Sequence, residues 1–216
     1  LTVARTYSGS ASNGVLSITG GGDSGSKSDV IDKVTIATLG NATDVGDLSE
    51  ALSGMCAMAN ATKAFFCGGD AASTNLDTIQ TCTWASLSNA ADHSDLVAAR
   101  AYAQAASNST HGLYFGGYND NAGTWFAAID RVDLTTSADA TDWGDLAANN
   151  AFAAGAGANA TRAVLCGGRI SSGASTTNEI QYASLTTATG SAADFGDLTS
   201  ARNRGAGTST GNGGLQ

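Results

Sequence analysis

Two dipeptides return four times along this chain at nearly constant spacing, and this repeat limits the possible folds more than any other feature. Gly-Gly marks the middle of each copy. The Asp-Leu pairs that close successive copies begin at Asp47, Asp95, Asp145 and Asp197 and are therefore 48, 50 and 52 residues apart. A period of about fifty residues is typical of architectures in which each copy is one supersecondary unit. We predict a single repeat domain over 1–216, with approximate units 1–48, 49–96, 97–146, 147–198 and a partial fifth unit, 199–216.

Each unit predicts four short strands. The first strand consists of small residues, as in 103–107 and 153–157, and an Asn-centred turn follows it. The second strand is apolar and ends at Gly-Gly, the third carries an Ile-x-x-Val signal, and the fourth is short. The fourth strands centre on Val45, His93, Trp143 and Phe195. Four short strands with few helix formers between them are typical of a β-propeller blade, and small first strands suit a crowded central axis.

These landmarks resemble kelch repeats, which end their second strand in Gly-Gly and carry an aromatic residue near the fourth strand. The third unit carries Arg100, Gly116-Gly117, Trp143 and Leu146, whereas Leu52 and Asn150 replace the expected arginine in two units. The low bulk of the repeats is similar to kelch-like repeats in structural proteins of bacteriophages. The resemblance implies an all-β, kelch-like β-propeller built from four-stranded antiparallel blades, with four full repeats plus one extra strand.

The two ends of the chain overlap within the repeat, because Leu1-Thr2-Val3-Ala4-Arg5 aligns with residues 198–202. The chain has no initiator Met and starts within its own repeat, so we expect a processed product or a piece of something longer. The surplus strand has three interpretations. The ring has five or more blades with part outside this sequence, which we favour; or the strand pairs with a neighbouring subunit; or it covers an exposed edge strand.

Charge and hydropathy argue against two classes of partner. With 19 acidic and 10 basic residues, the net charge is −9. Nucleic acid binding needs a basic patch, so we predict no nucleic acid partner, and an anionic membrane surface is disfavoured for the same reason. No run of about eighteen apolar residues exists, which predicts no membrane insertion.

The sequence predicts no enzymatic activity, no catalytic residue and no cofactor. The only histidines are His93 and His111, which we interpret as structural or exposed. The chain has no Gly-x-Ser-x-Gly, P-loop or Rossmann motif. Copper oxidases with kelch-type folds use a Tyr and His ligand set that two scattered histidines cannot supply.

We also predict no metal site. None of the four cysteines falls in a CxxC pair, which argues against zinc. Carboxylates three residues apart recur at each Asp-Leu, and they either ligate calcium or, as we favour, cap the turn and pair with the arginines. These pairs are Asp44/Asp47, Asp92/Asp95, Asp142/Asp145 and Asp194/Asp197.

Two further features leave alternatives open. Cys67 and Cys166 share a repeat position that we interpret as a packing position, but Cys56 and Cys67 can also face each other across a hairpin as a disulfide. Asn-x-Thr triplets match the glycosylation acceptor, although turn chemistry explains them better. The triplets begin at Asn41, Asn60, Asn108 and Asn159.

The variable loop after Gly-Gly in the third unit is the candidate binding surface, because rigid scaffolds present function on loops. Two bulky residues stand in this polar loop, where they either stack on a sugar or a neighbouring subunit, or cap the edge of the sheet. The candidate binding residues are Tyr118, Asn119, Asp120, Asn121, Trp125 and Phe126.

Uniform repeats and the lack of a catalytic motif predict a non-enzymatic structural or adhesive repeat protein. The resemblance implies a virion fibre, tail or decoration component, located in the virion or outside the cell. Its expected partners are other copies of itself or other structural subunits, with surface glycans as candidate ligands. The alternative is a glycan- or protein-binding propeller module that acts through the variable loops after each Gly-Gly.

Overall fold

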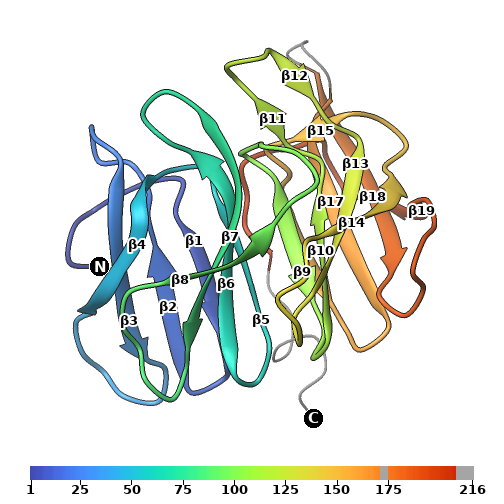
Figure 1. Ribbon diagram of the computed structural model, residues 1–216. Helices are drawn as coiled ribbons and strands as arrows, with labels where there is room; N and C mark the ends of the chain where they lie inside the picture. Colours follow the sequence, from blue (N-terminus) through green and yellow to red (C-terminus); the bar gives the residue numbers. More distant parts are fainter. Residues whose placement is uncertain (171–174, 208–216) are drawn as a thin grey trace.

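Every regular element in the described part of the chain is a β-strand, which confirms the all-β prediction. The computed structural model describes residues 1–170 and 175–207. Within these ranges each repeat forms one antiparallel sheet of four main strands in the predicted order (Figure 1). The same ranges hold no helix of the length and apolarity that crossing a membrane requires.

The four sheets are numbered in chain order. Sheet 1 contains β1 (Gly9–Ser12), β2 (Leu16–Gly20), β3 (Ser28–Thr35) and β4 (Thr43–Leu52). Sheet 2 contains β5 (Cys56–Ala59), β6 (Lys63–Asp70), β7 (Asn75–Thr83) and β8 (Ala91–Asp95). Sheet 3 contains β9 (Gln104–Ser107), β10 (His111–Phe115), β13 (Ala128–Asp133) and β14 (Thr141–Asp145). Sheet 4 contains β16 (Gly155–Ala158), β17 (Arg162–Ile170), β18 (Thr176–Ser184) and β19 (Ala193–Asp197), with the short β15 (Asn150–Ala151) also paired to β17.

The small first strands lie against one another, and the sheets follow in sequence order around them (Figure 1). β1 contacts β5, β5 contacts β9, and β9 contacts β16. Larger side chains form three apolar clusters, each between two consecutive sheets. The described residues do not close a ring, because β1 and β16 stand at the two ends of this series. The first strands thus meet one another, as expected for strands of small residues, but β5 also carries Cys56 and Met58.

The Gly-Gly pairs join each sheet to the segment that begins the next unit. We call these the entry segments: residues 1–7, 48–54, 96–102, 146–152 and 198–204. The second glycine of each pair donates its N–H to an entry-segment carbonyl. The bonds are Gly22 to Leu52 at 2.7 Å, Gly69 to Arg100 at 3.1 Å, Gly117 to Asn150 at 2.8 Å and Gly168 to Arg202 at 2.9 Å. Both glycines of every pair have positive φ, a region that glycine enters without steric cost.

A second series of hydrogen bonds connects the entry segments directly. The last residue of each segment has a left-handed φ between 54 and 67° and donates its N–H to the last residue of the preceding segment. The bonds are Gly54 to Tyr7 at 2.8 Å, Tyr102 to Gly54 at 2.7 Å, Phe152 to Tyr102 at 2.8 Å and Arg204 to Phe152 at 2.8 Å. One residue of each unit thus belongs to a single row of hydrogen-bonded residues that links the entry segments, and we call the line of this row the axis.

The residues in excess of four repeats take the position of a fifth entry segment. Arg202 accepts the hydrogen bond from Gly168, and Arg204 continues the left-handed series. The backbone of Gly205 passes so close to Ala154 that a Cβ there would lie 2.2 Å from the Ala154 carbonyl oxygen. The rest of the predicted partial fifth unit, residues 208–216, lies outside the described residues.

The residue that follows the third-strand isoleucine anchors each entry segment. Its side-chain oxygen accepts the N–H of the segment's second residue. The pairs are Thr2 with Asp32 at 3.2 Å, Ser49 with Gln80 at 2.7 Å, Val97 with Asp130 at 2.9 Å and Ala147 with Gln181 at 2.8 Å. This acceptor is an aspartate in the units whose segment carries an arginine, and a glutamine where Leu52 or Asn150 replaces the arginine.

The two arginine–aspartate pairs are buried ion pairs. Arg5 lies 2.8 Å from Asp32, and Arg100 lies 2.7 Å from Asp130, with all four side chains at most 1% exposed. Arg100 is also covered by the rings of Tyr114 and Phe126, at 5.1 and 5.0 Å from its guanidinium carbon. In the two units without the expected arginine, a neutral glutamine takes the place of the aspartate, so neither entry segment has a buried aspartate acceptor without its cation.

Turn side chains act as hydrogen-bond acceptors at the ends of the strands. The Oδ1 of Asn60 accepts the N–H groups of Thr62 and Lys63, and Asn108 and Asn159 repeat this arrangement. Among the described residues none of these asparagines has positive φ, so the turns depend on side-chain hydrogen bonds and not on a left-handed asparagine. Asp44, Asp142 and Asp194 each accept the N–H of the glycine two residues later, which is a turn-capping role. The expected pairing of these aspartates with the arginines is wrong, because Arg5 and Arg100 pair with the third-strand aspartates instead.

We expect Gly116→Ala to destabilise the fold by about 3–5 kcal/mol, because its Cβ would lie 2.1 Å from the Asn150 carbonyl oxygen at a φ of +59°. Urea denaturation measures the effect. Gly40→Ala is the control, since nothing lies within 4 Å of its Cβ position, and it should change stability by less than about 0.5 kcal/mol. Equal effects at the two glycines would contradict this account of the Gly-Gly pair.

We expect Arg100→Leu alone to cost about 3–5 kcal/mol, because it leaves Asp130 buried without its cation. The double change Arg100→Leu with Asp130→Gln copies the second unit's Leu52 and Gln80, and should recover at least half of that loss. A double-mutant cycle by denaturation measures the coupling. If the free-energy changes of Arg100→Leu and of Asp130→Gln simply add up to that of the double variant, the ion pair does not act as a unit.

Candidate functional site

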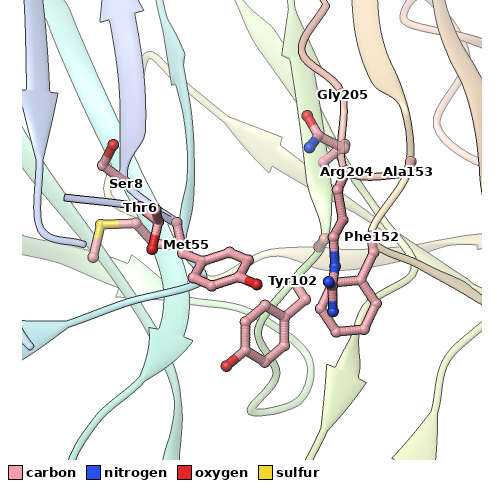
Figure 2. A pocket seen from close by; sticks show the side chains of 12 residues that line it. Thr6, Ser8, Met55, Tyr102, Phe152, Ala153, Arg204 and Gly205 are labelled. Atoms are coloured by element: carbon pink, nitrogen blue, oxygen red, sulfur yellow. The ribbon is translucent and has the colours of Figure 1, made fainter. Parts of the chain in front are cut away.

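The end residues of the entry segments line a pocket on the axis of the molecule, with a volume of about 380 Å³. Every unit contributes the same part of its sequence to the wall. The contributing residues are 6–8, 54–55, 102–104, 152–153 and 204–205. Figure 2 shows Arg204 standing against the Phe152 ring with Tyr102 next to them.

The side chains at the left-handed positions form a continuous aromatic surface along this pocket. Tyr7 meets Tyr102 edge to face at 5.8 Å between ring centroids, and Tyr102 stacks on Phe152 at 4.7 Å. Trp125 of β12 (Thr124–Trp125) extends the surface at 6.2 Å from Phe152. Tyr118 of β11 (Tyr118–Asn119) lies 4.9 Å beyond Trp125. Five rings that come from three units thus form one surface, although only 6% of the chain is aromatic.

The backbone conformation of Tyr7, Tyr102 and Phe152 is unfavourable for their residue type. Bulky residues rarely adopt a left-handed φ, which costs roughly 1–2 kcal/mol each because the Cβ crowds the carbonyl oxygen. The second unit has Gly54 at the same position, where the conformation carries no such cost. Aromatic rings at strained positions with a glycine alternative point to a role for the rings themselves.

Two guanidinium groups stand on the aromatic surface. Arg204 lies 5.1 Å from the Phe152 centroid and Arg169 lies 5.6 Å from the Trp125 centroid. Arg204 is exposed and forms no salt bridge within the described ranges. On the other side, burial and the nearby Asp70 and Asp120 carboxylates raise the pKa of Tyr102 to about 12, so this phenol stays protonated and able to donate.

The predicted loop residues divide between this surface and the scaffold. Tyr118 and Trp125 face each other across the hairpin and are half-buried. Asn119 donates to the Ala99 carbonyl and accepts from Ala122 N–H, while Asp120 N–H donates to Asn75 of sheet 2. Asn121 also reaches Asn75, and Phe126 covers the buried Arg100 as described above. The loop therefore adds two rings to the aromatic surface and is held by its polar residues.

Sequence reasoning missed Tyr7, Tyr102, Phe152 and Arg204. One signal was available, because each stands two residues after the position of Arg5, Arg100, Asn150 and Arg202 in the repeat. Three of five copies carry an aromatic residue at that position and the second carries Gly54. The left-handed conformation that connects these residues is not visible in the sequence.

The residues that the structure describes form no metal-binding cluster of side chains. They contain no cluster of three or more His, Cys, Asp or Glu that could hold a metal ion. All four cysteines are free thiols, although Cys56 and Cys67 are direct partners across β5 and β6. Burial raises the pKa of both of these thiols, which lowers their reactivity.

His93 occupies the aromatic position of its unit and serves the packing between sheets 2 and 3. Its ring meets Phe65 edge to face at 5.1 Å, and its Nδ1 lies 3.3 Å from Ser137 Oγ. Burial and the Lys63 charge lower its pKa below the usual histidine value. This environment matches the structural interpretation of His93.

No protein-family model matches this sequence, and no curated protein is significantly similar to it.

We expect stability to fall as the pH drops below about 6.5, the histidine pKa of an unfolded chain, toward the lower folded pKa of His93. In that window the unfolded state binds a proton that the folded state does not. His93→Phe should reduce this loss, and urea midpoints at pH 7.5 and 5.5 measure it. Burial and the Arg131 charge also lower the pKa of His111, so His111→Gln should reduce the loss further, and the double variant should show the least of it. An unchanged pH dependence in His93→Phe would contradict the assignment.

Proposed function

We propose that this chain is a non-enzymatic structural or adhesive repeat protein that binds a saccharide on the axial aromatic surface. We further propose that its four sheets are blades of a kelch-like β-propeller. The contacts between successive first strands and the Gly-Gly links to each next unit support this arrangement. The resemblance to kelch-like repeats of bacteriophage structural proteins supports a virion fibre, tail or decoration component as the setting.

The observation that carries the proposal is that aromatic residues with a left-handed backbone conformation surround a pocket. Sugar rings present CH groups that pack on aromatic faces, and their hydroxyls need donors and acceptors nearby. Tyr102 and Phe152 supply the faces, and Thr6, Ser8 and Gln104 supply polar groups in the same wall. The volume of about 380 Å³ falls within the roughly 300–1,000 Å³ of small-molecule sites.

Arg204 favours a saccharide that carries a negative group. Its guanidinium is exposed at the pocket wall, with its plane supported by Phe152. A guanidinium binds carboxylate or sulfate through paired hydrogen bonds. Since the chain as a whole carries a net charge of −9, attraction for such a ligand must come from local groups of this kind.

We expect Tyr102→Gly and Phe152→Gly to weaken saccharide binding at least tenfold while changing the melting temperature little. Glycine matches Gly54 and relieves the left-handed strain of roughly 1–2 kcal/mol, which offsets the lost ring packing. A glycan array with acidic and neutral members identifies the ligand, and titration calorimetry of the strongest hit measures affinity. Trp125→Ala should also weaken binding, and Arg204→Gln should weaken binding of acidic members alone.

The control is Val97→Ala, which shortens an exposed apolar side chain outside the pocket. It should leave affinity unchanged. An array without any bound saccharide, or glycine variants that bind as the wild type does, would overturn the proposed function.

A further inference from the structure

The two ends of the series of sheets leave opposite faces uncovered. In sheets 2 and 3 the fourth-strand residues His93 and Trp143 are 7% and 3% exposed, because the following sheet covers them. Phe195 has the same position in sheet 4 and is 57% exposed. Its ring rests on Tyr182 of its own sheet at 6.1 Å. Sheet 4 thus presents the face that every other sheet buries against its successor.

Sheet 1 presents the complementary face. Ile36 donates its N–H to the carbonyl of Val15 in the turn between the first two strands. In the other units Trp84, Leu134 and Leu185 donate to the same position of that turn and are therefore the counterparts of Ile36. These three counterparts are at most 8% exposed and belong to the apolar clusters shared with the preceding sheet. Ile36 is 54% exposed and Leu39 is fully exposed, because no sheet of the described residues packs on them.

We propose that a second copy of this chain packs its sheet 1 on the uncovered face of sheet 4, so that copies assemble head to tail. The contact repeats a packing that already occurs three times within the chain. In each of those interfaces a fourth-strand residue of one sheet faces the segment that follows the third strand of the next sheet. Phe195 of one copy and Ile36 of the other take these two positions.

The entry segments supply the polar part of this contact, at the Asp32 side chain of sheet 1. In sheet 1, Asp32 binds Thr2 through N–H and hydroxyl and binds Arg5 through its guanidinium. Residues 198–202 repeat the same Leu-Thr-x-Ala-Arg sequence. The guanidinium of Arg202, however, hydrogen-bonds only to Thr199 and Ser200 of its own segment, and it forms no salt bridge with a carboxylate of the described chain. In the assembly, Thr199 and Arg202 of one copy bind Asp32 of the next and replace its own Thr2 and Arg5.

A contact between two different faces leaves one face of each kind free on a dimer, so assembly does not stop at two copies. Such contacts extend into a filament, or close into a ring where the rotation between copies permits it. In a filament and in a ring alike, the hydrogen bonds that link the ends of the entry segments continue from one copy to the next through Arg204.

Sedimentation velocity between 1 and 200 μM tests the proposal. We expect species larger than the monomer to grow with concentration. Phe195→Asp and Ile36→Asp should each weaken self-association at least tenfold, and Val97→Asp, the same kind of change at an exposed valine within the series, should not. Circular dichroism and melting curves confirm that each variant folds.

Mixing the two face variants separates head-to-tail packing from any other dimer. The Phe195→Asp copy keeps an intact sheet 1 and the Ile36→Asp copy keeps an intact sheet 4. The mixture should therefore form a complex of two copies that neither variant forms alone. Arg202→Leu should weaken assembly and Arg5→Leu should not, because only Arg202 crosses between copies. A folded wild type that stays monomeric at 200 μM, or a mixture that forms no complex, would overturn the proposal.

Discussion

The N–H of the second glycine in each Gly-Gly pair, bonded to the carbonyl of the next entry segment, sets the relation between successive sheets. This bond needs two consecutive residues with positive φ and a backbone free of Cβ, because the first glycine lies directly against the same carbonyl. Strand pairing can arise within each unit alone, but the angle and distance between units depend on this contact. The first strands can then meet only if their side chains are small, which the sequence provides.

Burial of polar groups follows from the same geometry. Once an entry segment is held by Gly-Gly, its second N–H faces the third strand of its own sheet and needs an acceptor there. An aspartate serves when an arginine neutralises it, and a glutamine serves when none is present. The charge of the acceptor therefore varies together with the residue at the arginine position, although the backbone arrangement is the same in all four units.

The sequence predicted the four main strands of each sheet and their order, because both rest on a period that the chain repeats four times. It did not predict the short strands β11, β12 and β15, which lie outside that pattern. The third-strand isoleucines and the residues Val45, His93, Trp143 and Phe195 fall on the expected strands. The site was predicted only in part. Tyr118 and Trp125 stood out as bulky residues in a polar loop, but Tyr102 and Phe152 look like ordinary apolar residues in the sequence. Their importance depends on a left-handed backbone that only the three-dimensional arrangement reveals.

The axial surface and the uncovered faces depend on one another through the fifth entry segment. Arg204 lines the pocket, and it is held there because its N–H continues the left-handed series from Phe152. The same segment carries Arg202, whose counterparts Arg5 and Arg100 are buried against aspartates. In the proposed assembly an aspartate of the next copy gives Arg202 the same kind of partner. The segment that places Arg204 at the pocket would then also carry the contact between copies.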